Sequence, residues 1–304
     1  MSARLLLAAD YIKAHQNPDG GWGYEPGRTS LVEPTGLCVL ALHARGDVAG
    51  AGRGLAFLKK CLKPSGAMGL DPRDGEGSWM AYAALLAFHA LGASEEERHL
   101  RGWVLAVEDA SGRFTKNEIA TVAARYRYDA SIPGWAWTPR TTAWVEPTAL
   151  FVLALIHVGT PVAEKRIQSG IDLILDRKVP SGGWNFGNPF SKSFELEATA
   201  MSTALALAAL GAAGIPEGHP AVAAGLRFLE KSLAGEASTA TLAWSVLALK
   251  SFPGTYVQAR DAADRLAGLQ AGDGGFRGNL FETALSYLVL EGASILDPAS
   301  RRPR

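Results

Sequence analysis

The sequence predicts an all-α protein, a single (α/α)6 barrel that spans residues 1–304 as one domain. Segments with the helical spacing of apolar residues occur in pairs, six times along the chain, and no segment shows the alternation of a β-strand. The first helix of each pair is amphipathic and the second is more apolar all round, as expected for an inner helix. Neither terminal pair has the polar character of a capping repeat, which favours a closed barrel over an open solenoid.

The first pair illustrates the plan. Residues 5–16 have a helical pattern, and the turn chemistry of Asn17-Pro18-Asp19-Gly20-Gly21-Trp22 ends it. A second helix begins around Glu33-Pro34-Thr35, where proline suits the first helical turn because its missing N–H is not needed there. Gly46 ends this helix. The sequence therefore predicts an outer helix, a glycine-containing turn and an inner helix.

The other pairs repeat this plan in order. Four outer helices open with a glycine that apolar residues follow, and the last is expected over 259–269; the glycines are Gly54, Gly102, Gly170 and Gly225. The inner helices are predicted to begin near residues 34, 79, 147, 198, 239 and 282. A longer excursion, Ser111 to Pro133, interrupts the third pair and carries Arg125-Tyr126-Arg127-Tyr128. We expect it to cover the barrel mouth, with diphosphate binding as the alternative.

Composition limits the function classes. The net charge is zero, which argues against nucleic acid as a partner, and no apolar stretch is long enough to span a membrane. Cys38 and Cys61 are too few for a disulfide framework, and no zinc-binding spacing occurs. We therefore expect a cytoplasmic protein without a metal or cofactor. Peripheral membrane contact and a homodimer stay open.

Two motifs carry a resemblance to a known superfamily. Gln16-x-x-Asp-Gly-Gly-Trp22 and Gln270-x-x-Asp-Gly-Gly-Phe276 resemble the Gln-Trp repeats of squalene-hopene cyclases and protein prenyltransferases. Gly54-Leu-x-Phe-Leu and Gly225-Leu-x-Phe-Leu are similar to the helix that precedes those repeats. The resemblance implies the barrel fold and an apolar, polyprenyl substrate or ligand. The zinc ligands of the protein prenyltransferases have no match here, which argues against protein prenylation.

The segment after Trp184 is similar to the acid motif of class II terpene cyclases. Glu195-Leu196-Glu197-Ala198-Thr199 falls where that family has Asp-x-Asp-Asp-Thr at the start of an inner helix. The resemblance implies that Glu197, assisted by Glu195, donates the proton that starts cyclisation. Both glutamates replace aspartates, and Ala198 replaces the third carboxylate. The alternative is that the two glutamates only cap the helix, where acidic residues favour the N-terminus.

Other acidic and aromatic residues are candidates for substrate binding. Glu33, Glu146 and Glu282 stand at the first turns of inner helices, either as capping residues or as an acidic ring at the barrel mouth. Rings on inner helices could line a cavity and stabilise a carbocation through their faces; they are Trp79, Tyr82, Trp144, Phe151, Trp244, Phe281 and Tyr287. The turn aromatics are expected to join neighbouring helices instead; they are Trp22, Trp135, Trp184 and Phe276.

Three functions follow from these features. The first is a terpene-cyclase-like isomerase that starts cyclisation by protonation. The second is a barrel that holds an isoprenoid or another apolar ligand without catalysis. The third and least favoured is a glycoside-processing barrel that uses two of the acids as its carboxylate pair.

Overall fold

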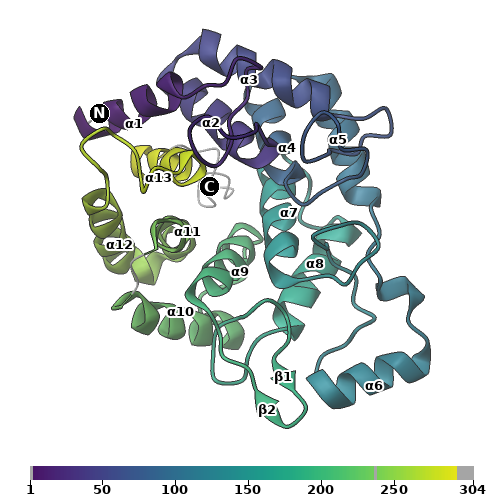
Figure 1. Cartoon of the computed structure of the whole chain (residues 1–304). Helices are drawn as coiled ribbons and strands as arrows, with labels where there is room; N and C mark the ends of the chain where they lie inside the picture. Colours follow the sequence, from purple (N-terminus) through teal and green to yellow (C-terminus); the bar gives the residue numbers. More distant parts are fainter. Residues whose placement is uncertain (1–2, 236–237, 293–304) are drawn as a thin grey trace. The chain divides into compact units, whose positions relative to one another are not determined.

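The structure, a computed structural model, describes residues 3–235 and 238–292. Within them lie thirteen α-helices, two short 3-10 helices and one two-stranded hairpin (Figure 1), so the all-α class is confirmed. Contacts divide these residues into two compact units. Unit 1 contains residues 3–106 and 263–292, and unit 2 contains residues 107–235 and 238–262. The single domain over 1–304 stays a prediction beside this division.

Unit 1 is built on three apolar helices that pack side by side, with α2 between α4 and α13. Amphipathic helices pack against them: α1 against α13 and α2, α3 against α2, and α5 against α4. The bounds are α1 Ala3–Ala14, α2 Val32–Arg45, α3 Val48–Cys61, α4 Ala81–Ala90, α5 Ser94–Ala106 and α13 Leu280–Glu291. The chain passes from unit 2 to unit 1 within α12, Tyr256–Gly268.

Unit 2 has the same plan, with α9 between the inner helices α7 and α11. The outer helices α8 and α10 pack on α7 and α9 respectively. The bounds are α7 Val145–His157, α8 Lys165–Asp176, α9 Ala200–Ala212, α10 Pro220–Leu233 and α11 Thr239–Lys250. The remaining elements are the 3-10 helices Ser111–Arg113 and Pro253–Thr255, helix α6 Lys116–Tyr126, and strands β1 Phe190–Ser191 and β2 Phe194–Glu195.

The predicted helix pairs are confirmed. Each inner helix begins within two residues of its predicted start, and twelve of the helices form six outer–inner pairs in chain order. Helix α6 belongs to no pair and was not predicted, because the excursion in which it lies was expected to be irregular. Thr115 and Glu118 form a capping box at its start, with the Thr115 side chain accepting from the Glu118 backbone N–H. This Thr-x-x-Glu spacing was the available sequence signal.

Glycines in the outer helices make room for the turn tryptophans. A Cβ atom on Gly54 of α3 would lie 2.7 Å from the Trp22 indole, and one on Gly225 of α10 would lie 2.5 Å from Trp184. Gly170 of α8 stands in the same relation to Trp135, at 2.8 Å. These separations are too short for any side chain. The repeated glycine therefore lets an outer helix lie directly on the indole ring, as predicted for aromatics that join neighbouring helices.

Alanine substitutions at two glycines of α3 are expected to change the free energy of unfolding in opposite directions. Gly54→Ala is expected to lower the free energy of unfolding by about 1–3 kcal/mol, because the added methyl group overlaps Trp22. Gly52→Ala, two residues earlier on α3, meets nothing within 4 Å and is expected to raise it by about 0.5–1 kcal/mol. Urea unfolding of both variants measures the difference. Equal effects of the two substitutions would contradict the packing role of Gly54.

Candidate functional site

A threonine on each of four inner helices ties the helix to the turn aromatic that precedes it. The Trp22 backbone N–H donates to Thr35 Oγ1 (2.9 Å), and that hydroxyl donates back to the Trp22 carbonyl (3.2 Å). Thr148 makes the same two bonds to Trp135, and Thr203 makes them to Trp184. Thr283 accepts from the Phe276 N–H at 2.9 Å. These threonines therefore define one register for α2, α7, α9 and α13.

This register shows which residues are equivalent. Each of these threonines lies four residues after the N-cap of its helix, and the residue two after the N-cap varies; it is Glu33 in α2, Glu146 in α7, Met201 in α9 and Phe281 in α13. In α9 the N-cap is Thr199, so Glu197 precedes the helix. Glu197, which was expected at the start of an inner helix, therefore lies four residues before the position that Glu33 and Glu146 hold. Glu282 is one residue past the equivalent position.

Glu33 is the most enclosed of the predicted acids. It is 3% exposed, and each of its carboxyl oxygens accepts a hydrogen bond from a tyrosine. Tyr82 of α4 donates to Oε1 at 2.7 Å, and Tyr24 donates to Oε2. Trp79 stacks on Tyr82 with 6.2 Å between ring centroids, and Phe281 lies 6.0 Å from the Tyr24 ring. All of these residues belong to unit 1.

Tyr24 was not among the predicted residues. Its carbonyl accepts a hydrogen bond from the Leu280 N–H at the start of α13 (2.7 Å), while its side chain reaches Glu33 on α2. Leu70 and Phe186 accept equivalent bonds from the first residues of α2 and α7, at 3.0 and 2.9 Å. Tyr24 and Phe186 each lie two residues after a turn tryptophan, and Leu70 lies two after Met68, so the same place in three repeats lies at the start of a neighbouring inner helix. That position in the repeat was the signal available in the sequence.

The surroundings of Glu33 favour its protonated form. Burial raises the pKa of Glu33 to about 7, although the hydrogen bonds from Tyr24 and Tyr82 lower it in part. Burial, reinforced by the Glu33 charge, also raises the pKa of both tyrosines. The two phenols therefore stay protonated as donors while the carboxyl exchanges its proton near neutral pH. A buried carboxyl of this kind is typical of a general acid.

The raised pKa of Glu33 predicts a pH-dependent stability. The folded protein keeps the Glu33 proton up to about pH 7, whereas the unfolded chain loses it near the ordinary value of 4.5. The contribution is therefore complete below the unfolded pKa and is lost as the pH rises through the folded pKa, by at most about 1.4 kcal/mol per pH unit. Urea unfolding over this range should show a steeper decline for the wild type than for Glu33→Gln. Parallel curves would contradict the raised pKa.

Glu146 forms a second, more open acid site in unit 2. Its Oε1 accepts from the Ser202 hydroxyl at 2.7 Å, and Thr199 donates to Ser202 at 2.9 Å. Glu146 is half-buried, and burial raises its pKa while the Ser202 hydrogen bond lowers it in part. Ser202 was not predicted. It follows the N-cap Thr199 by three residues, a spacing that a capping analysis of α9 could have found.

The predicted catalytic pair lies in a different environment. Glu195 is on strand β2 and Glu197 is in the segment before α9, and both are exposed. Hydrogen bonds from the side chain and backbone of Ser181 lower the pKa of Glu195. Neither residue is in a helix, so they do not cap α9, and the cap is Thr199. An exposed carboxyl with a lowered pKa lacks the enclosure that a proton donor to an alkene requires.

The predicted substrate-binding rings divide into two groups. Trp79, Trp144 and Phe281 are half-buried at or near helix starts. Phe151, Trp244 and Tyr287 are buried further along their helices, and Phe151 packs against Trp135 with 5.8 Å between centroids. Phe151, Trp244 and Tyr287 are at most 2% exposed, so these three rings are core residues. Tyr82 is also buried, but its hydroxyl reaches Glu33.

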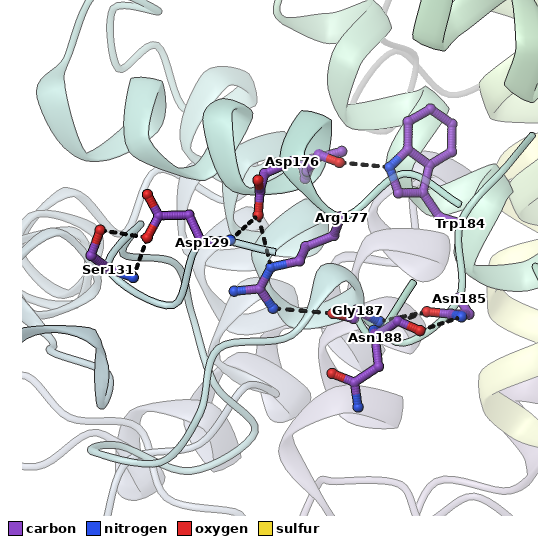
Figure 2. A network of polar contacts seen from close by, with 9 residues as sticks. Asp129, Ser131, Asp176, Arg177, Trp184, Asn185, Gly187 and Asn188 are labelled. Atoms are coloured by element: carbon purple, nitrogen blue, oxygen red, sulfur yellow. Dashed lines mark hydrogen bonds and ion pairs between the residues drawn. The ribbon is translucent and has the colours of Figure 1, made fainter. Parts of the chain in front are cut away.

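A buried arginine holds the end of the excursion (Figure 2). Arg177 is 2% exposed, its guanidinium lies 3.5 Å above the Tyr128 ring, and it donates to Asp176 (3.3 Å) and to the Gly187 carbonyl (3.1 Å). The Asp129 N–H also donates to Asp176, at 3.0 Å. One side chain therefore ties the excursion to the loop before β1. Covering a site and binding diphosphate both stay predictions.

No helix within residues 3–235 and 238–292 is long and apolar enough to cross a membrane. Over the same residues, no three His, Cys, Asp or Glu side chains are grouped so that they could hold a metal ion.

Comparison with known proteins shows the fold. No protein-family model matches the chain, and no curated protein does. Among solved structures, a protein from Actinoplanes matches with a TM-score of 0.65 and 17% identity, over 96% of this chain and 99% of the other. A variant of the type II terpene cyclase MstE from Scytonema, in complex with the substrate geranylgeranyl dihydroxybenzoate, matches with a TM-score of 0.63 and 16% identity, over 98% of this chain and 97% of the other.

A solved structure with a similar TM-score belongs to a protein with a different activity. A novel α-amylase from Clostridium perfringens has a TM-score of 0.63 and 12% identity, over 95% of this chain and 98% of that one. The chain therefore has the fold of the type II terpene cyclase, as predicted, and shares it with proteins of other activities. The fold alone does not select among them.

Proposed function

We propose that the protein cyclises a polyprenyl or related apolar substrate by protonation, with Glu33 as the proton donor. The observation that carries the proposal is the buried Glu33 carboxyl, held at both oxygens by tyrosine hydroxyls. The likeness to a type II terpene cyclase supports the reaction class. Donors fixed in advance on the conjugate base lower the energy of the charge that forms when the proton leaves.

The reaction balances without another reactant. The proton moves from Glu33 to one carbon of a terminal double bond, and a cation forms at the other carbon. Internal double bonds attack in turn, each closing a ring, and the last cation loses a proton from a neighbouring carbon. The product is an isomer of the substrate. The substrate would approach Glu33 from the side of Tyr24 and Phe281, which are only half-buried.

Incubation in deuterated water tests the proposal. The purified protein is given linear polyprenyl chains with and without a terminal epoxide or diphosphate, and geranylgeranyl dihydroxybenzoate, and the extracts are examined by mass spectrometry. We expect a cyclised product that carries one deuterium. Return of every substrate unchanged would refute the cyclase and favour the non-catalytic ligand-binding protein, whose ligand should appear in an organic extract of freshly purified material.

The likeness to an α-amylase favours glycoside processing as the second candidate. Hydrolysis needs one carboxyl as acid and a second as base or nucleophile. Glu33 would serve as the acid because its pKa is raised. Incubation with starch-derived oligosaccharides distinguishes the two: release of shorter sugars, lost in Glu33→Gln, would support the hydrolase and contradict the cyclase.

A further inference from the structure

We propose that Tyr24 is the proton relay that recharges Glu33 from solvent. The proposal rests on the proposed function, since each protonation of a substrate would leave Glu33 as a carboxylate that must regain a proton. Glu33 is 3% exposed, so bulk water cannot reach its oxygens freely. The proton must therefore pass through a neighbouring group.

Burial distinguishes the two tyrosines that contact Glu33. Tyr82 is 1% exposed and stacks on Trp79, so it is enclosed with the carboxyl. Tyr24 is only half-buried and lies in the segment between the Trp22 turn and α2. Of the three groups in the chain Tyr82–Glu33–Tyr24, Tyr24 is thus the most exposed.

The hydrogen-bonding capacities of the three groups place the acidic proton of Glu33 on the carboxyl oxygen that contacts Tyr24. A carboxylate accepts from both phenols, but a neutral carboxylic acid has one O–H that must donate. The enclosed Tyr82 hydroxyl continues to donate to Oε1. Tyr24 can turn its O–H towards solvent and accept from Oε2, with which it is already in hydrogen-bond contact. The acidic proton of Glu33 therefore resides on Oε2.

Recharging then takes one coupled step. A solvent hydronium ion donates a proton to the Tyr24 oxygen as the phenolic proton moves to Glu33 Oε2, so that one O–H bond of Tyr24 forms while the other breaks. The hydronium becomes water and the carboxylate becomes a neutral acid. Burial and the Glu33 charge raise the pKa of Tyr24, so a phenolate does not accumulate between the two transfers.

A pH jump measures recharging without a substrate. The protein is mixed from well above to well below the Glu33 pKa of about 7, and the carboxylic acid band is followed by time-resolved infrared spectroscopy, assigned by its loss in Glu33→Gln. We expect Tyr24→Phe to protonate Glu33 at least about tenfold more slowly than the wild type. Tyr82→Phe is the matched control and should protonate without delay.

Two further arms separate a relay from a structural role. Difluorotyrosine at position 24 keeps the hydroxyl and should restore the wild-type rate. If cyclisation occurs, Tyr24→Phe should slow the turnovers after the first more strongly than it slows the first. Protonation of Glu33 at the wild-type rate in Tyr24→Phe would overturn the relay. Failure of the proposed function would appear separately, as no product from the wild type, while the pH jump would still decide the role of Tyr24.

Discussion

Glu33→Gln is expected to lower the cyclisation rate at least about 100-fold, the usual contribution of a general acid. Glutamine has nearly the same shape as glutamic acid but cannot donate a proton to an alkene. Its amide can still accept from Tyr82 and donate to Tyr24, so the surroundings of the side chain should persist. Rates of product formation and circular dichroism of both proteins measure the effect.

The exposed glutamates supply the controls. Glu195→Gln and Glu197→Gln change the same chemical group outside the Glu33 site, and we expect both to keep the wild-type rate. If Glu197→Gln abolished turnover and Glu33→Gln did not, the acid would be the one that the resemblance to class II cyclases implied. The three variants therefore decide between the two locations of the proton donor.

The fold could be predicted because its signals repeat. Apolar spacing, glycine turns and prolines in first helical turns recur along the chain, and each occurrence supports the others. Gly54, Gly170 and Gly225 are an example, since all three lie against a turn tryptophan. Helix α6 was missed because it belongs to no pair and none of its residues is buried. Its capping box was its one clear signal.

The site was predicted only in part, because either of two threonines at the start of α9 could be aligned with the threonine of the other inner helices. Thr199 follows Glu197 in the same spacing as Thr35 follows Glu33, but Thr203 makes the hydrogen bonds to the turn tryptophan. A loop that is longer in this repeat shifts the register. Glu33 was chosen as a candidate from its place in the repeat, yet its enclosure depends on Tyr24 and Tyr82, which contact it through the packing of neighbouring helices.

Trp22→Ala is expected to lower the free energy of unfolding by about 3–5 kcal/mol. The indole is fully buried, lies against Gly54, and donates from Nε1 to the Ile12 carbonyl at 2.8 Å. Truncation leaves a cavity and removes one of the two donors to the Ile12 carbonyl, the other being the His15 N–H at 3.3 Å. Urea unfolding measures the loss. Phe194→Ala, at a ring that is 74% exposed, is the control and should change stability by no more than about 0.5 kcal/mol.

Trp22→Phe separates the two causes of that loss. Phe276 holds the equivalent position before α13, so a phenyl ring is compatible with this turn. The substitution keeps most of the ring volume but removes the indole donor, so that the Ile12 carbonyl keeps only the His15 N–H at 3.3 Å, at a cost of about 0.5–1.5 kcal/mol. A loss as large as that of Trp22→Ala would show that the hydrogen bond outweighs the packing.

Trp184→Ala extends the test to the domain organisation. Trp184 is buried in unit 2, donates from Nε1 to the Ile174 carbonyl at 2.6 Å and lies against Gly225, so its truncation should cost about as much as that of Trp22 in unit 1. If the chain unfolds as one domain, both variants shift a single transition to lower urea with an unchanged slope. If the units unfold separately, each variant shifts one of two transitions. The second result would contradict the predicted single domain over residues 1–304, because a closed ring of helix pairs that shares one core should lose its folded structure in one step.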